Sequence, residues 1–309
     1  MFGGSYHAGA SGVGAVSPTR GVVSAVRLCW ARAWRSRVRV VVVAVFGDAH
    51  AHAEALDAVI GAAEACGVQE LWSLGDMTGG GPDPEHVVAR TRERCAVALM
   101  GNHDYGATGS AEPTRFGAPG SCAARSIELA RERLSAAEVQ WMRSRRPAAR
   151  RGEVQCWHAS PRNPVHEYVG ASNAAACLAA QRGALGLVGH THVAAAWRGT
   201  PGGASAVKIV VGVPLDLTGG KWLLNPGAVG APAPSRVGWW DGLDLEAADG
   251  AYWLLLDLQE QMATWRRAPY DPAPARLRAR ALGLDGAAGS VSCDPRRRAS
   301  GSARRGRPA

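Results

Sequence analysis

Five short apolar segments of the chain each end at side chains that commonly bind metal ions. Successive ends lie 26 to 56 residues apart, a spacing that suits strand–helix–strand crossovers. Because the carboxyl ends of parallel strands meet at one edge of a sheet, we expect these side chains to converge there. The segments and the side chains that follow them are 38–46 with Asp48 and His50, 71–74 with Asp76, 96–100 with Asn102, 154–157 with His158, and 185–188 with His190 and His192.

The ligand types indicate a pair of divalent ions. Mixed imidazole and carboxylate ligands favour Mn²⁺, which we place first, with Fe, Ni²⁺ or Zn²⁺ as alternatives, over Mg²⁺ or Ca²⁺. Seven side chains exceed the needs of one ion, and they supply four contacts to each of two ions if one carboxylate bridges. Two divalent ions would outweigh the charges of Asp48 and Asp76, so the excess can bind hydroxide and a phosphate oxyanion.

Backbone geometry predicts how the paired ligands approach one centre. In each of the pairs Asp48-x-His50 and His190-x-His192, an extended backbone would point both side chains to the same side.

Composition bounds the class of protein. The seven cysteines are scattered and never spaced as C-x-x-C, which favours a reducing, cytoplasmic location over a disulfide framework. No apolar run reaches the ~18 residues of a membrane span. The net charge of +9 comes from the two ends, because residues 1–47 hold six Arg and no acid and residues 273–309 hold nine Arg and two Asp. The acidic body makes nucleic acid an unlikely partner for it, although the Arg-rich ends could bind one.

The same patterns set the expected domain boundaries. We expect 1–37 to be a disordered basic leader or a mis-assigned start, with an organelle transit peptide as a weaker alternative. We expect one domain at 38–272 and a disordered basic Pro/Ala/Arg-rich tail at 273–309. Asp83 before Pro84, and Ser135 with Glu138, are helix-start signals. The expected helices span about 123–134, 136–145 and 173–181, and the later strands span 193–197, 208–213, 222–224, 252–258 and 263–268.

The ordered motifs resemble the calcineurin-like metallophosphoesterase superfamily, in its small prokaryotic type, over about 40–270. Smaller marks of the resemblance are Gly-Pro-Asp-Pro at 81–84, Ser160-Pro161, Asn225-Pro226-Gly227 and Pro269-Tyr270-Asp271. The main blocks read Asp48-Ala-His50, Gly75-Asp76, Gly101-Asn102-His103-Asp104, His158 and Gly189-His190-Thr-His192.

The resemblance implies a fold and a ligand assignment. The fold would be α/β (α+β), a four-layer sandwich of two mixed sheets packed face to face with helices outside. Asp48, His50, Asp76 and His192 would hold one ion, and Asp76, Asn102, His158 and His190 would hold the other, with Asp76 bridging. His103 would face the substrate and stabilise the phosphoryl group or protonate the leaving oxygen.

The chain departs from the family at two positions, where Ala51 and Ala159 replace glycine; a left-handed backbone there would be strained. Arg162 could reach a substrate phosphate, and His52 could line the site. Asp104 could orient His103 or cap the next turn, and the glycines at 79–81 favour a turn over a phosphate cradle. We expect His7, His86 and His166 to be structural.

The function that follows is a dinuclear-metal phosphoesterase acting on phosphomonoesters or phosphodiesters through a metal-bridging hydroxide. Within enzymes, a nucleotide polyphosphate hydrolase or a protein phosphatase is the alternative. Outside enzymes, the alternative is a non-catalytic binding scaffold on the same fold. A nuclease is less consistent with the acidic body.

Overall fold

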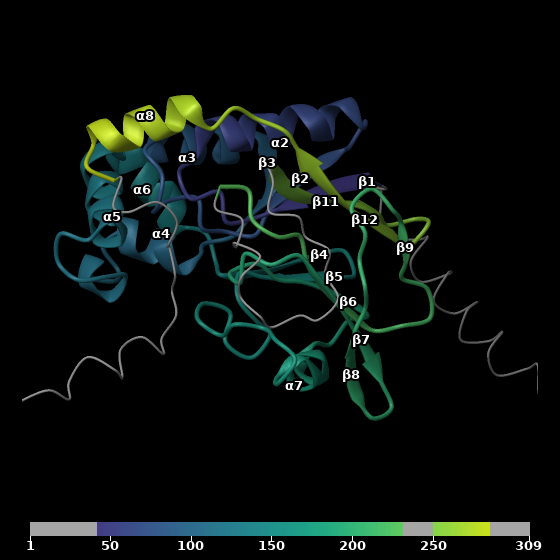
Figure 1. The fold of residues 1–309 in the computed structure, drawn as a ribbon. Helices are drawn as coiled ribbons and strands as arrows, with labels where there is room; N and C mark the ends of the chain where they lie inside the picture. Colours follow the sequence, from purple (N-terminus) through teal and green to yellow (C-terminus); the bar gives the residue numbers. More distant parts are fainter. Residues whose placement is uncertain (1–41, 231–249, 285–309) are drawn as a thin grey trace, which may run out of the picture. The chain divides into compact units, whose positions relative to one another are not determined.

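The computed structural model describes residues 42–230 and 250–284, which form two mixed six-stranded sheets with helices on their outer faces (Figure 1). Sheet A has the order β3-β2-β1-β11-β12-β9, and sheet B has the order β4-β5-β6-β10-β7-β8. The strands of sheet A are β1 Val42–Phe46, β2 Glu70–Ser73, β3 Cys95–Ala98, β9 Leu215–Asp216, β11 Ala251–Asp257 and β12 Met262–Ala268. The strands of sheet B are β4 Ala148–Arg151, β5 Val154–Trp157, β6 Leu185–Leu187, β7 Ala195–Thr200, β8 Gly203–Ala206 and β10 Trp222–Asn225.

The helices complete the expected four layers. Helix α2 packs on β11 and β12, α3 packs on β3, and α7 packs on β7 and β8 at the opposite face of the sandwich. No helix within the described ranges is both long and apolar enough to cross a membrane. The helices are α2 Ala53–Ala65, α3 Pro84–Arg94, α4 Asn102–Ala107, the 3-10 turn η1 Pro113–Arg115, α5 Cys122–Arg133, α6 Ala136–Arg143, α7 Ala174–Ala180 and α8 Ala273–Ala281.

The direction of the parallel strands determines where the predicted ligands lie. In sheet A, β1, β2 and β3 run parallel, and in sheet B, β5 and β6 run parallel, so five carboxyl ends face one edge region. Apolar residues of β1 and one face of α2 pack together in the core on the outer side of sheet A, where Phe46, Leu56 and Ile60 are at most 1 % exposed. This buried scaffold makes the loops beyond the strand ends the natural place for polar ligands.

Polar contacts join the two sheets. The Trp265 indole in β12 donates to the backbone oxygen of Asn225 in β10 at 2.7 Å. At another point, Arg151 in β4 pairs with the carboxylate of Glu70 in β2, which also accepts a bond from the Trp72 indole at 2.8 Å. The sheets therefore meet through specific partners as well as through apolar packing.

The structure corrects four expectations about elements. The segment Lys208–Val213 is not a strand, because Gly212 adopts a left-handed φ of 83° and Val210 and Val213 are at least 50 % exposed. Residues 273–281, expected to be disordered, form α8. Strands β4, β8 and β9 were not expected, nor was α4, which begins inside the motif at Asn102. The capping box of Ser135 and Glu138 is confirmed. The leader 1–37, with His7, and the tail beyond 284 lie outside the described residues.

Candidate metal centre

All seven predicted ligands lie together beyond the ends of β1, β2, β3, β5 and β6. Three of them, Asp48, His50 and Asp76, lie in the loops that follow β1 and β2 of sheet A. Asn102 opens α4 after β3, and the remaining three are the histidines after β5 and β6, His158, His190 and His192. Six of the seven, together with His103, fall into compact groups in which every pair of candidate ligand atoms lies within 4.8 Å. These groups are Asp48, His50 and His192; His50, Asp76 and His103; and Asp76, His158 and His190.

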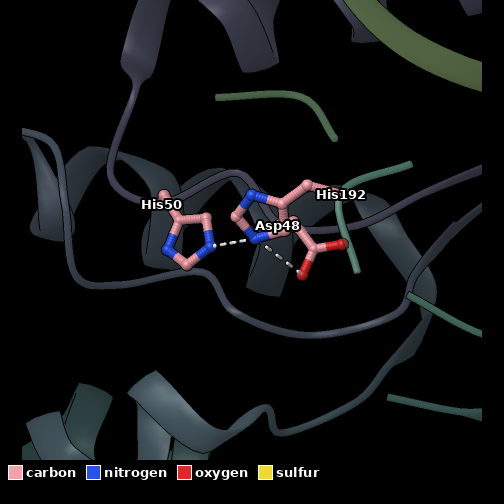
Figure 2. A group of neighbouring side chains, drawn as sticks. All are labelled: Asp48, His50 and His192. Carbon is pink, nitrogen blue, oxygen red and sulfur yellow. Dashed lines mark hydrogen bonds and ion pairs between the residues drawn. The ribbon is translucent and has the colours of Figure 1, made fainter. Parts of the chain in front are cut away.

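The first group joins the β1 loop to the β6 loop (Figure 2). The Nε2 atoms of His50 and His192 lie 2.9 Å apart, and His192 Nε2 lies 3.7 Å from Asp48 Oδ1. Asp48 also accepts hydrogen bonds from the His190 backbone N–H at 3.1 and 3.2 Å. Two imidazole nitrogens and a carboxylate oxygen therefore converge on one point.

Asp76 lies between the two sides of the centre. Its Oδ2 atom is 3.7 Å from His50 Nε2 and 3.5 Å from His158 Nε2, and no hydrogen bond to that buried oxygen is found within the described part of the chain. Its other oxygen accepts the His103 backbone N–H at 2.9 Å. On the far side, His158 Nε2 lies 3.0 Å from Asn102 Oδ1. A buried carboxylate oxygen without a donor is the arrangement expected of a bridging ligand.

Backbone oxygens set the orientation of two imidazole rings. His50 Nδ1 lies 3.2 Å from Thr78 O and 3.0 Å from Gly79 O, and His158 Nδ1 lies 2.9 Å from Leu74 O. When Nδ1 carries the proton and donates to these carbonyls, Nε2 keeps a free lone pair directed into the centre. This is the arrangement in which histidine usually binds a metal ion.

Five of the seven ligands have left-handed backbones, which corrects the expectation of extended pairs. Asp48 and His50 have φ values of 55° and 47°, and His190 and His192 have φ values of 65° and 61°. Asp76 is left-handed too, with φ of 51°. These five side chains therefore converge because the chain turns at each of them, and not because a strand alternates. Asp and His tolerate this conformation better than most residues, and strain of this kind gathers at functional sites.

Burial governs the electrostatics of the centre. Burial raises the pKa of Asp48 and Asp76 well above the ordinary value, and neighbouring carboxylates add to the effect. Burial likewise lowers the pKa of His50 and His190, and it lowers the pKa of His158 to about 3. These three imidazoles are therefore neutral and do not supply positive charge to the two buried carboxylates. Divalent cations would supply that charge, so the residues fit a metal centre.

His103 and Asp104 have separate roles. His103 is 3 % exposed, its ring stands edge-on to His50 with centroids 4.7 Å apart, and burial lowers its pKa to about 3. Its Nδ1 atom is buried and has no hydrogen-bond partner among the described residues. Asp104 does not orient it. Instead, Asp104 accepts hydrogen bonds from the backbone of Gly101, Met77 and Thr78 and from the Thr78 hydroxyl, at 2.9 to 3.3 Å.

Comparison with known proteins identifies the family. Residues 41–240 match the calcineurin-like phosphoesterase superfamily domain. The chain belongs to this superfamily. A crystal structure of a metallophosphoesterase from Sphaerobacter thermophilus has a TM-score of 0.67 and 28 % identity, covering 80 % of this chain and 95 % of that one.

Two further matches support the fold or cover a fragment of the chain. A hypothetical protein from Pyrococcus horikoshii has a TM-score of 0.60 and 16 % identity, covering 79 % of this chain and 94 % of that chain, and it supports the fold alone. An uncharacterized protein from Methanocaldococcus jannaschii is 35 % identical over 81 residues. That match spans 26 % of this chain and 33 % of the relative's length.

The two departures from the superfamily pattern differ in consequence. Ala51 is fully buried and has a left-handed φ of 58°, so the expected strain is present there. Ala159 is buried but is not among the residues with positive φ, so alanine fits at that position. The loop at 79–81 is a turn around His50, because a Cβ at Gly81 would lie 2.6 Å from the His50 backbone oxygen. Neither departure removes a ligand.

The remaining predicted residues lie around the centre. Arg162 is exposed and pairs with Glu167 at 3.3 Å, and His52 lies near Glu54, Asp83 and Arg278, so substrate contact by Arg162 or His52 stays a prediction. His86 pairs with Asp57 at 2.8 Å, as expected of a structural histidine.

Asn225 supports the loop that carries two of the ligands. Its Nδ2 donates to Gly189 O at 2.8 Å and to the Thr191 hydroxyl at 3.0 Å, which fixes the loop that carries His190 and His192. Two aromatic neighbours were not predicted. Phe116 packs near His103, and Tyr168 stacks on His190. Neither carries a sequence signal, because both lie in irregular loops whose course depends on tertiary packing.

Proposed function

We propose that this protein is a dinuclear metal-dependent phosphoesterase that hydrolyses phosphomonoesters or phosphodiesters of small molecules. The observation that carries the proposal is the position of Asp76, whose unpartnered Oδ2 lies within 3.7 Å of imidazole nitrogens from both halves of the centre. Membership of the phosphoesterase superfamily supports the same reaction class.

The residues divide into two ligand sets that share Asp76. Asp48, His50 and His192 would complete one set, and Asn102, His158 and His190 the other. Two divalent ions held there would acidify a water molecule and neutralise phosphoryl charge. We place Mn²⁺ first, with Fe, Ni²⁺ and Zn²⁺ as alternatives, because nitrogen and oxygen ligands are mixed.

His103 would act on the substrate through hydrogen bonding. It is a neutral imidazole, so it can donate one N–H to a phosphoryl oxygen or to the leaving oxygen. Its buried Nδ1 has no partner among the described residues, so contact with a substrate oxygen would satisfy a polar atom that is otherwise orphaned. Its neighbour Asp104 would hold the loop that presents it.

The test combines metal analysis with hydrolysis of a phosphomonoester and a phosphodiester. We expect His103→Ala to keep two bound ions and lose about 10²-fold or more in turnover. We expect Asp76→Asn to lose both ions. His86→Ala, which removes a surface histidine paired with Asp57, should change neither the metal content nor the rate.

Two results would decide against the proposal. Metal binding without hydrolysis of any phosphoester would favour the non-catalytic scaffold on the same fold. Retention of two ions by Asp76→Asn would show that this carboxylate is not the bridge.

A further inference from the structure

Two loops place aromatic rings against histidines of the metal centre. Phe116 follows η1, and its ring centroid lies 4.8 Å from that of His103 at an interplanar angle of 47°. Tyr168, in the loop between β5 and α7, stacks on His190 with centroids 4.1 Å apart at 12°. His103 and His190 belong to two ligand groups that share Asp76, so the two rings border neighbouring groups that meet at this carboxylate.

Each ring is held by its own surroundings. A Cβ at Gly106 would lie 2.6 Å from Phe116 Cε2, so a glycine in α4 makes room for the phenyl ring. The Tyr168 backbone oxygen accepts a hydrogen bond from Asn173 Nδ2 at 2.9 Å. Tyr168 nevertheless stays 38 % exposed, although one ring face packs on His190. Such an exposed ring directly beside buried ligands is placed to meet an incoming molecule.

Basic side chains accompany the rings on both loops. Arg115 precedes Phe116, and His166 lies two residues before Tyr168; both side chains are exposed. Partial burial, and then the Arg115 guanidinium, lower the pKa of His166, so the two loops lie within electrostatic range of each other. Burial is the main cause of the lowered pKa of His158 and His190, and His166 adds to it in both. His166 is therefore near the centre, which was not expected of it.

We propose that Phe116 and Tyr168 form an aromatic rim that selects phosphoesters with a planar aromatic group next to the phosphoryl group. The guanidinium of Arg115, next to Phe116, is a positive charge that suits an anionic substrate of this kind. The inference rests on the proposed phosphoesterase function, and it adds the class of substrate. Tyr168 and Phe116 would be specificity-determining residues at the ester group, with the ligands and His103 acting at phosphorus.

The test uses pairs of compounds that differ only in aromaticity. Benzyl phosphate and cyclohexylmethyl phosphate both release a primary alcohol, so a difference in kcat/KM does not come from the leaving group. Benzylphosphonate and cyclohexylmethylphosphonate resist hydrolysis and allow binding to be measured by calorimetry. We expect the Mn²⁺-loaded protein to prefer the benzyl compound of each pair by about fivefold, which is the effect of one aromatic pair.

Variants distinguish two roles of the aromatic rings, recognition of the substrate and support of the metal-binding histidines. Tyr168→Leu and Phe116→Leu should bring the benzyl preference close to one, while Tyr168→Phe, which keeps the ring, should retain it. Trp141→Leu removes a partly buried aromatic side chain of α6 and serves as the control that keeps the preference. Metal content, measured for every variant, shows whether the centre itself is intact.

Three outcomes have distinct meanings. Equal binding of the two phosphonates by the wild-type protein would overturn the proposal that the rim selects aromatic groups. A Tyr168→Leu variant that weakens both compounds alike would overturn it too, because the ring would then only support His190. A benzyl preference in phosphonate binding with no hydrolysis of either ester would support the rim and refute the phosphoesterase function.

Discussion

Asp104 is a carboxylate that supports the metal centre without belonging to the predicted ligand set. It is fully buried in α4, and its oxygens accept four hydrogen bonds from the two loops that carry Asp76 and Asn102. Burial raises its pKa to about 6, while the donated bonds act in the opposite direction. The Asp104 side chain therefore connects the two loops through its hydrogen bonds.

Replacing Asp104 by Asn should destabilise the fold. The amide nitrogen would face backbone N–H donors, so at least one buried donor would lose its acceptor, at a cost of about 3 kcal/mol in the free energy of unfolding. Urea denaturation measures the change. Asp57→Asn, on the exposed side of α2, breaks surface pairs with His86 and Arg90 and should cost under about 1 kcal/mol. Equal midpoints for the two variants would contradict this role of Asp104.

Helix α8 is the element that sequence patterns misjudged most clearly. Its Arg278 binds both carboxylate oxygens of Asp83 at 2.7 Å and reaches Glu54 Oε1 at 2.6 Å. Asp83 was expected to cap α3, but its side chain makes no cap bond and pairs with Arg278 instead. The Asp83 backbone also donates to Ala51 O at 3.0 Å, so α8 is connected to the loop behind His50.

Arg278→Ala should loosen α8. Arg278 is 41 % exposed, so water screens the pairs and we expect a loss of only about 1 kcal/mol. Hydrogen exchange should speed up in residues 273–284 and at the start of α2, and it should change little elsewhere. Arg276→Ala, an exposed arginine in the same helix, is the matched control. Unchanged exchange in α8 would show that the Arg278 pairs do not hold it.

Strands that consist of an apolar run could be predicted from the sequence. Elements that form only because a neighbouring segment lies beside them could not. Val154–Trp157 was predicted with its observed bounds because an apolar run is a local signal. Its partner β4 reads Ala-Ala-Arg-Arg and forms a strand only because β5 lies beside it. Residues 208–213 look like a strand, yet Gly212 donates to Trp265 O from a turn. The ligands were recognisable as ordered motifs, but their left-handed backbones and the stacking of Tyr168 arise from tertiary contacts.

The metal centre lies across the junction of the two sheets. Asp48 and Asp76 follow strands of sheet A, whereas His158 and His192 follow strands of sheet B. An ion bound by both sets would connect the sheets, in addition to the contacts made by Trp265 and Arg151. Because a cation that binds only the folded chain stabilises it, thermal stability should report occupancy of the centre.

Removing metal should lower the melting temperature. Mn²⁺ at about 100 times its Kd should add about 2.7 kcal/mol to the free energy of unfolding, and a chelator should abolish that gain. Calorimetry of chelated and Mn²⁺-loaded protein measures it. Asp76→Asn is the control, since its melting temperature should not respond to Mn²⁺. A wild-type protein equally stable with and without the ion would contradict binding across the two sheets.

The left-handed turns at five ligands trade conformational stability for metal binding. These ligands are Asp48, His50, Asp76, His190 and His192. A non-glycine residue gives up roughly 1–2 kcal/mol to hold such a turn. Glycine at any one of them would relax the backbone while deleting a ligand, so some inactive variants should outlast the working protein on heating. Selection for thermal stability alone would therefore enrich such inactive variants. Directed evolution of this chain should select for turnover in the same round.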